Sequence, residues 1–197
     1  MTWAIRWAAA ALFVAASPFA VQAQVSGSAP TPAPWIAHDF TVPTLVEGSG
    51  FKLVPLGPAL TAIDYRAYMA SIDHLQRTFT RSTAWPHAGL TMKDAVIDME
   101  TEARRFAARE SFAYAVLTPD GSRERGCVYV YPSKVAGHDA QVQLWVTAAE
   151  YEAGFDAELY AWTREWIARA WPFRNVAWPG RSIAWDEWDA AVAKGKG

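Results

Sequence analysis

The sequence predicts an α/β domain with a mixed sheet, in which two helices follow the first strand and one long helix precedes the last strand. Three observations support this class. Apolar residues recur at steps of three and four in several segments, as they do on one face of a helix. In other segments they alternate at steps of two, as in a half-buried strand. Clusters of Gly, Pro and Asp separate the segments, and a 52% hydrophobic composition is ample for the core of one domain.

The first helix is predicted over residues 62–79. Thr61 stands directly before it, as an N-cap residue whose hydroxyl can accept a backbone hydrogen bond. Steps of three and four place five side chains on one stripe, which consists of Tyr65, Tyr68, Ile72, Leu75 and Phe79. This stripe is expected to face the sheet.

Two further helices are predicted before the C-terminal segment. Thr91 and Asp94 have the spacing of a capping box, so the second helix is expected to begin at Thr91. Its buried stripe is expected to consist of Val96, Met99, Ala103 and Phe106. The long helix is predicted over residues 156–170, and its inner face is expected to consist of Phe155, Leu159, Trp162 and Trp166. A short helix over residues 185–193 completes the chain.

The strands are predicted from the segments of period two and their flanking turns. They cover residues 51–56, 112–117, 126–131, 140–147 and 175–178. Pro119, Asp120 and Gly121 form a turn signal, so the second and third strands are expected to pair as an antiparallel hairpin. Tryptophans crowd the last third of the chain. They either fill the core beside the long helix or line an aromatic ligand pocket.

Residues 1–23 are predicted to be a cleavable signal peptide. Arg6 precedes a short apolar run, and small residues at positions 21 and 23 suit a signal peptidase. The run is too short for a membrane anchor. We therefore expect a periplasmic or secreted mature protein with no membrane span. Residues 24–50 are predicted to be a flexible tether and an N-terminal arm, and residues 51–197 the folded domain.

The composition excludes several classes of function. Cys127 is the single cysteine, so an internal disulfide is excluded, and we expect this thiol to be a small buried hydrophobic residue. The formal net charge of −2 gives no basic face, so no nucleic-acid partner is expected. No pair of histidines has the spacing of metal ligands, so no metal site is expected.

The element order from Phe51 to Trp178 resembles the GNAT superfamily of N-acetyltransferases. Local phrases are similar to those of GNAT-like bacterial proteins: FKLVPLGP, FAYAVLTPDG, GCVYVYP and LWVT. The resemblance implies a GNAT-like fold, acyl transfer to an amine, and an acetyl-CoA cleft between the fourth and fifth strands. It also implies that a Q/R-x-x-G-x-G/A loop holds the cofactor's pyrophosphate at the start of the long helix.

The resemblance assigns residues to this cofactor cleft. The cofactor positions are Trp145, Val146, Thr147, Gly154 and Phe155. The loop itself is degenerate: Gly154 is the only residue that matches the family pattern. Tyr151 stands in place of Gln or Arg, and Asp156 in place of a small residue. Three carboxylates, from Glu150, Glu152 and Asp156, are expected near the place of the pyrophosphate. Asp156 could instead cap the helix.

Two residues are candidates for catalysis. Tyr129 could protonate a leaving thiolate if it faces the cleft, and half-buried packing in the strand is the other interpretation. Glu100 could act as a base, although an amphipathic helix more often exposes such a residue.

We therefore expect an exported GNAT-like protein with lost or altered CoA-dependent acyl transfer and a cleft for a small ligand. One alternative is an active N-acyltransferase with a remodelled donor site, which would use acetyl-CoA. The other is a non-catalytic module that contacts a component of the cell envelope. Otherwise no cofactor is expected, and the partner is a small molecule or an envelope component.

Overall fold

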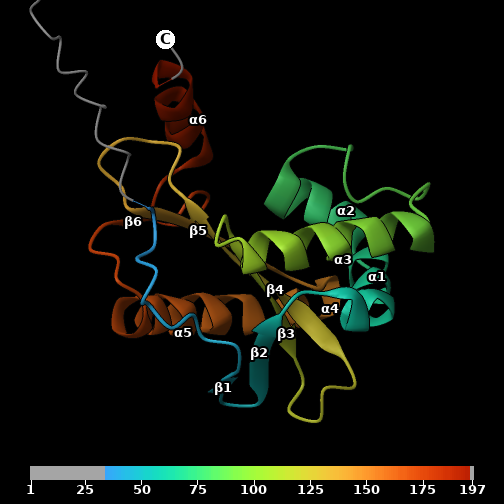
Figure 1. Cartoon of the computed structure of the whole chain (residues 1–197). Coiled ribbons are helices and arrows are strands. Elements are labelled where there is room, and N and C mark those ends of the chain that lie inside the picture. The colour runs from blue at the N-terminus through green and yellow to red at the C-terminus, as the bar shows by residue number, and fades with distance from the viewer. Residues whose placement is uncertain (1–33, 196–197) are drawn as a thin grey trace, which may run out of the picture. The chain divides into compact units, whose positions relative to one another are not determined.

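A computed structural model describes residues 34–195, and within them six strands form one sheet with helices on both faces (Figure 1). The strand order is β1-β2-β3-β4-β5-β6. Neighbouring strands are antiparallel, except that β5 and β6 are parallel. The mixed α/β sheet expected from the sequence is confirmed. The predicted signal peptide, residues 1–23, lies outside the described residues. Within residues 34–195 no helix has the length and hydrophobicity that crossing a membrane requires.

The strands lie close to their predicted ranges. Their bounds are Val46–Gly48 (β1), Phe51–Pro55 (β2), Phe112–Leu117 (β3), Glu124–Pro132 (β4), Ala140–Val146 (β5) and Val176–Ala177 (β6). The hairpin of β3 and β4 is confirmed. Strand β1 was not predicted. It forms because Gly50 adopts a φ of +77°, which lets the chain reverse and pair β1 with β2.

The helices precede and follow the central hairpin. Their bounds are Pro58–Leu60 (η1), Thr61–Met69 (α1), Ile72–Leu75 (α2), Gln76–Thr80 (η2), Met92–Ala107 (α3), Ala148–Glu152 (α4), Phe155–Ala170 (α5) and Trp185–Lys194 (α6). The single first helix that we predicted over residues 62–79 is wrong, because the chain breaks after Met69 and continues through α2 into the π-helical turn η2.

The break after α1 has a structural partner. Ser71 is buried at the break, and its hydroxyl accepts a hydrogen bond of 3.0 Å from the backbone N–H of Ala148, the first residue of α4. Thr61 is not the N-cap of α1 but its first residue, and its hydroxyl donates to the carbonyl of Pro58. The break therefore lets Ser71 hold the start of α4, far away in the sequence.

Helix α3 begins as predicted but is rotated from its predicted face. The capping box of Thr91 and Asp94 is present, with both reciprocal hydrogen bonds. Val96 is exposed, contrary to the prediction, whereas Ala95 and Met99 are buried. Glu102 is also buried, so the inner stripe includes a carboxylate that a purely apolar pattern could not place.

Two apolar cores lie on opposite faces of the sheet. Alternation along β3 sends Tyr114 and Val116 to one core and Ala113 and Ala115 to the other. The first core packs against α5 and contains Leu159, and the second packs against α1, α2 and α3. Most of the late tryptophans belong to these cores, with Trp166, Trp171 and Trp178 on the α5 face and Trp145 on the other.

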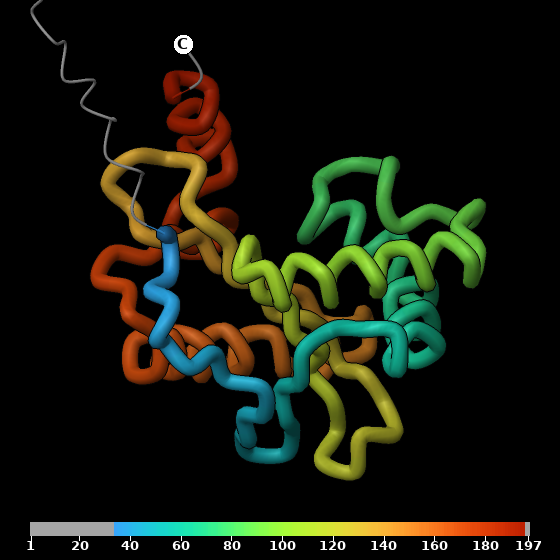
Figure 2. Tube along the Cα trace, viewed as in Figure 1, coloured from blue at the N-terminus to red at the C-terminus, as the bar shows by residue number. Residues whose placement is uncertain are grey.

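The segment before β1 packs on the α5 side of the molecule (Figure 2). Trp35 stacks on Phe112 and Phe173, and its indole N–H donates to the carbonyl of Asp139. Ile36 is buried in the same core. From Pro34 onward, the predicted N-terminal arm is therefore a packed part of the domain.

Replacing Leu159 with Ala should destabilise the protein by about 2–5 kcal/mol, because this side chain is fully buried between α5 and the sheet. Leu45 is 59% exposed, so Leu45→Ala is the matched control and should change the free energy of unfolding by less than about 0.5 kcal/mol. Urea unfolding of the purified protein measures both. Equal effects would show that the inner face of α5 is wrongly assigned.

Candidate functional site

A cleft opens where β5 and β6 separate. The two strands pair only at Ala140 with Val176 and at Gln141 with Ala177. Strand β6 ends there, whereas β5 continues to Val146. The cleft has a volume of about 290 Å³, and most of its residues come from η2, β5 and the turn after β6, with single residues from α2, α4, α5 and α6. Parallel sheets bind ligands where strands diverge at their carboxyl ends, so this is the first candidate site.

An ion pair closes the end of the cleft at the start of α5. Asp156, in the first turn of α5, accepts two hydrogen bonds from the guanidinium of Arg181, at 2.5 and 2.7 Å. Arg181 belongs to the turn that follows β6, so the pair fastens this turn to α5. The pairing also raises the pKa of Arg181 above its usual value. The suggestion that Asp156 caps the helix is wrong, because Gly154 is the N-cap and no side chain caps it.

Glu150 lies away from the cleft. It is buried and accepts hydrogen bonds from Arg123 at 2.6 Å and from Arg125 at 2.6 and 2.9 Å. Burial acts to raise the pKa of Glu150, but the hydrogen bonds from the two arginines outweigh it, and the net pKa is lowered. The expected concentration of three uncompensated carboxylates is therefore wrong. Two of the three are neutralised by arginine, and Glu152 is exposed without an ion-pair partner among the described residues.

The residues predicted to hold a cofactor are divided among three places. Trp145 and Val146 line the cleft. Thr147 instead caps α4, where its hydroxyl accepts from the N–H of Glu150. Gly154 is exposed at the start of α5, with a φ of +82° and no atom within 4 Å of where a Cβ would stand. Phe155 is buried, with the Arg125 guanidinium 3.4 Å above its ring. Their role in holding a cofactor stays a prediction.

The two catalytic candidates lie in different environments. Tyr129 is half-buried and is not among the residues that line the cleft; its hydroxyl accepts a hydrogen bond of 3.2 Å from the indole N–H of Trp145, which does line it. Burial raises the pKa of Tyr129 well above its usual value. Glu100 is exposed on α3, and no hydrogen bond joins it to Tyr129 in the described part of the chain. A catalytic role for either residue stays a prediction.

Four further side chains that line the cleft were not among the predicted site residues. His74 and Arg77, from α2 and η2, line it together with Arg181 and Trp185. The His74 ring packs on Tyr151 with 4.8 Å between centroids, and burial lowers its pKa. No sequence motif identifies these residues. They lie after the break that follows α1 and after β6, and they come together only in the folded structure.

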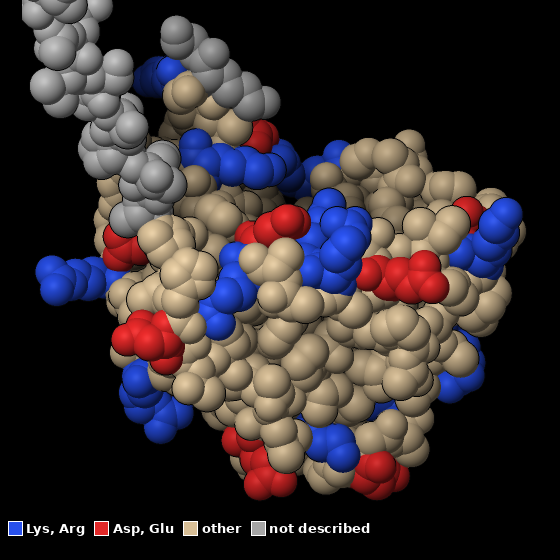
Figure 3. Space-filling model, in the orientation of Figure 1, with Lys and Arg blue, Asp and Glu red and all other residues tan. Residues whose placement is uncertain are grey.

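A second hollow lies beside α6. Figure 3 shows a notch between α6 and the segment that carries η2, with basic side chains along it. This groove has a volume of about 600 Å³, and its lining includes Tyr131, Lys134 and Trp188. Arg81 bridges the two sides, because it pairs with Asp189 at 2.8 Å and lies 4.2 Å from the ring of Trp185.

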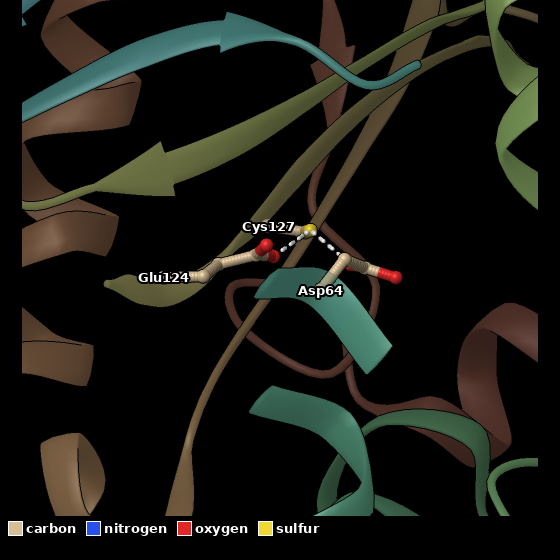
Figure 4. A group of neighbouring side chains, drawn as sticks. All are labelled: Asp64, Glu124 and Cys127. Atoms are coloured by element: carbon tan, nitrogen blue, oxygen red, sulfur yellow. Dashed lines mark hydrogen bonds between the residues drawn. The ribbon is translucent and has the colours of Figure 1, made fainter. Parts of the chain in front are cut away.

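A buried cluster of three acidic groups lies between α1 and β4 (Figure 4). The Cys127 thiol donates to Glu124 Oε1 at 3.0 Å, and its sulfur lies 3.8 Å from Asp64 Oδ1. Burial raises the pKa of Asp64 to about 7 and raises that of Glu124 and of Cys127 well above their usual values. Cys127 is buried as predicted. Its two carboxylate neighbours were not predicted. Glu124 lies just before the predicted strand of residues 126–131, and Asp64 lies outside the predicted apolar stripe of the first helix.

Replacing Glu150 with Gln should destabilise the protein by about 1–3 kcal/mol at pH 7, because Arg123 and Arg125 lose a charged acceptor. The folded-state pKa of Glu150 is below its usual 4.5. The stability that the ionised carboxylate contributes is therefore complete above pH 4.5, and it is lost as the pH falls through the lowered pKa. The difference between wild type and variant should therefore shrink in acid. The exposed neighbour provides the control, since Glu152→Gln should change little at any pH. A pH-independent difference in urea unfolding would contradict the ion-pair assignment.

Comparison with known proteins gives structural likeness but no match in sequence. No protein-family model and no curated protein matches the chain. A ribosomal-protein-S5-alanine acetyltransferase from Vibrio fischeri has a similar structure, with a TM-score of 0.55, 14% identity, and 78% of this chain and 81% of that chain covered. The microcin C7 self-immunity acetyltransferase MccE, solved with acetyl-CoA and AMP, matches with a TM-score of 0.52 and 14% identity. The match covers 76% of this chain and 79% of that chain. A protein from Bordetella pertussis described as a GNAT-family acetyltransferase matches with a TM-score of 0.51 and 16% identity. The match covers 76% of this chain and 85% of that chain. The chain therefore has the fold of the GNAT acetyltransferases.

Proposed function

We propose that the mature protein is exported, binds a small polar ligand in the cleft between β5 and β6, and does not transfer acetyl groups from CoA. The observation that carries this proposal is the ion pair of Asp156 and Arg181 at the start of α5. The family resemblance assigns this same place to the cofactor's pyrophosphate. In this chain, a carboxylate and a guanidinium that already satisfy each other occupy it.

The electrostatics of the pair oppose a pyrophosphate. An anion at a helix N-terminus needs free N–H groups and a positive local field. Arg181 would supply such a field, but Asp156 neutralises it at 2.5 Å. A phosphate about 4 Å from the carboxylate would meet a repulsion on the order of 4 kcal/mol at an effective dielectric of about 20. Binding CoA would therefore require the pair to open.

The lining of the cleft suits a ligand with both polar and planar parts. Arg77, His74 and Gln143 offer polar groups, and Trp145 and Trp185 offer aromatic surface. A few convergent polar groups beside aromatic walls are typical of small-molecule sites, and about 290 Å³ is near the lower end of their size range. The proposed ligand is therefore smaller than a nucleotide cofactor.

An active acyltransferase with a remodelled donor site is the second candidate, and one observation favours it. Gly154 leaves open space at the N-terminus of α5, with nothing within 4 Å of where a side chain would begin. A phosphate could approach the backbone closely there. MccE, which has a similar structure, was solved with acetyl-CoA. In this alternative Arg181 would exchange Asp156 for a phosphate.

Export is proposed from the predicted signal peptide. N-terminal sequencing of the protein from cell-envelope fractions should begin at Gln24 or within a few residues of it. A cytosolic protein that starts at Met1 would contradict export without affecting the assignment of the cleft.

Isothermal titration of the mature protein with acetyl-CoA at low salt should give no saturable heat below about 1 mM. Asp156→Asn should improve binding, because it frees Arg181 for an anion, whereas Glu152→Gln removes an equal charge nearby and should not. A micromolar dissociation constant for the wild-type protein would overturn the proposal and restore the acyltransferase.

A further inference from the structure

We propose that Asp64, Glu124 and Cys127 form a zinc site with three protein ligands, enclosed between α1 and β4. This inference is independent of the proposed function, because the cluster lies outside the cleft between β5 and β6. It also departs from the sequence-based expectation of no metal site. That expectation considered histidine spacing, whereas these ligands come from a helix and from the first half of β4.

The two sulfur–oxygen distances in the cluster lie on either side of the spacing that zinc requires. Zinc bonds of about 2.3 Å to sulfur and about 2.0–2.2 Å to oxygen, in tetrahedral geometry, place a sulfur and an oxygen ligand about 3.6 Å apart. The Cys127 sulfur lies 3.0 Å from Glu124 Oε1 and 3.8 Å from Asp64 Oδ1, on either side of that value. All three ligand atoms lie within 4.8 Å of one another. Small rotations of the side chains would complete the geometry.

An unsatisfied oxygen in the cluster points to a missing ligand. Glu124 is 2% exposed, and its Oε2 has no hydrogen-bond partner among the described residues. Its carboxylate is directed toward Cys127 (Figure 4). Within residues 34–195 no Lys, Arg or His forms an ion pair with Asp64 or Glu124. Without a cation, protonation lowers the cost of burying these two carboxyl groups, because burial raises the pKa of both. A divalent ion would take the place of the protons and would satisfy the free oxygen.

The donor set selects zinc over the alkaline-earth ions. Magnesium and calcium prefer oxygen ligands alone, whereas a thiolate suits zinc. When zinc binds, the thiol proton and any proton on the carboxyl groups leave to solvent. Glu124 also lines a cavity of about 330 Å³, together with Arg66, Ser71 and Thr147. Glu124 is the one ligand of the three that lines this cavity, so we expect the ion to enter from that side and to take a solvent molecule as its fourth ligand, as in zinc sites with three protein ligands.

Titration of the metal-free mature protein with zinc, in competition with a chromophoric chelator, tests the site. We expect one equivalent to bind, with at least about tenfold weaker binding in Cys127→Ser and in Glu124→Gln. Glu102→Gln is the matched control, because Glu102 is also buried and has an unsatisfied oxygen, but it pairs with Arg105 and has no thiol beside it. This control should bind zinc as the wild type does. Unchanged binding in Cys127→Ser, or equal loss in Glu102→Gln, would overturn the proposal.

A second measurement needs no variant and so does not depend on the folding of a substituted core. Cobalt added to the metal-free wild-type protein should produce the near-ultraviolet charge-transfer absorption of a thiolate–cobalt bond at one equivalent. Because Cys127 is the single cysteine of the chain, the band can arise only there. Saturation with cobalt without this band would overturn the assignment of Cys127 as a ligand.

Discussion

Parallel pairing between β5 and β6 stops after two residue pairs, and the cleft depends on that divergence. What holds the diverging end in place is the ion pair of Asp156 and Arg181, which ties the turn after β6 to the start of α5. The pair also determines the chemistry that the cleft can support. The guanidinium of Arg181, which could otherwise bind an anion near the start of α5, is engaged by a carboxylate of the chain itself. The proposed loss of CoA use follows from this single contact.

The two faces of the sheet differ in the polarity of their buried side chains. The α5 face is an aromatic core in which Trp166 and Trp171 pack beside Leu159, and it contains no cluster of acidic groups among the described residues. The face covered by α1 and α3 includes buried polar groups beside its apolar side chains: Asp64, Glu124 and Glu102. Glu102 pairs with Arg105, whereas Asp64 and Glu124 have no basic partner among the described residues and lie beside a thiol, an arrangement that the proposed zinc site would explain. The cleft and the acidic cluster are therefore separate candidates within one fold.

The sequence predicted the fold well where local patterns decide it. Period-two alternation located β3, the capping box of Thr91 and Asp94 located α3, and turn signals located the hairpin. The prediction was wrong where a contact between distant residues determines the local structure. Ser71 is an example, because its hydrogen bond to α4 accompanies the break in the predicted first helix. The contacts that build the candidate sites could not be predicted for the same reason. Arg181 and Asp156, or Glu124 and Cys127 with Asp64, meet only through tertiary structure, and a linear charge count could not show that Glu150 and Asp156 are neutralised.

A double-mutant cycle on Asp156 and Arg181 tests most directly whether the ion pair that defines the cleft exists in solution. The free energies of unfolding would be measured for the wild type, Asp156→Asn, Arg181→Met and the double variant at pH 7 and low salt. Both side chains are partly buried and share two hydrogen bonds, so the account predicts a favourable coupling energy of about 1 kcal/mol or more, decreasing with added salt. A coupling energy of zero, with strictly additive single effects, would contradict it.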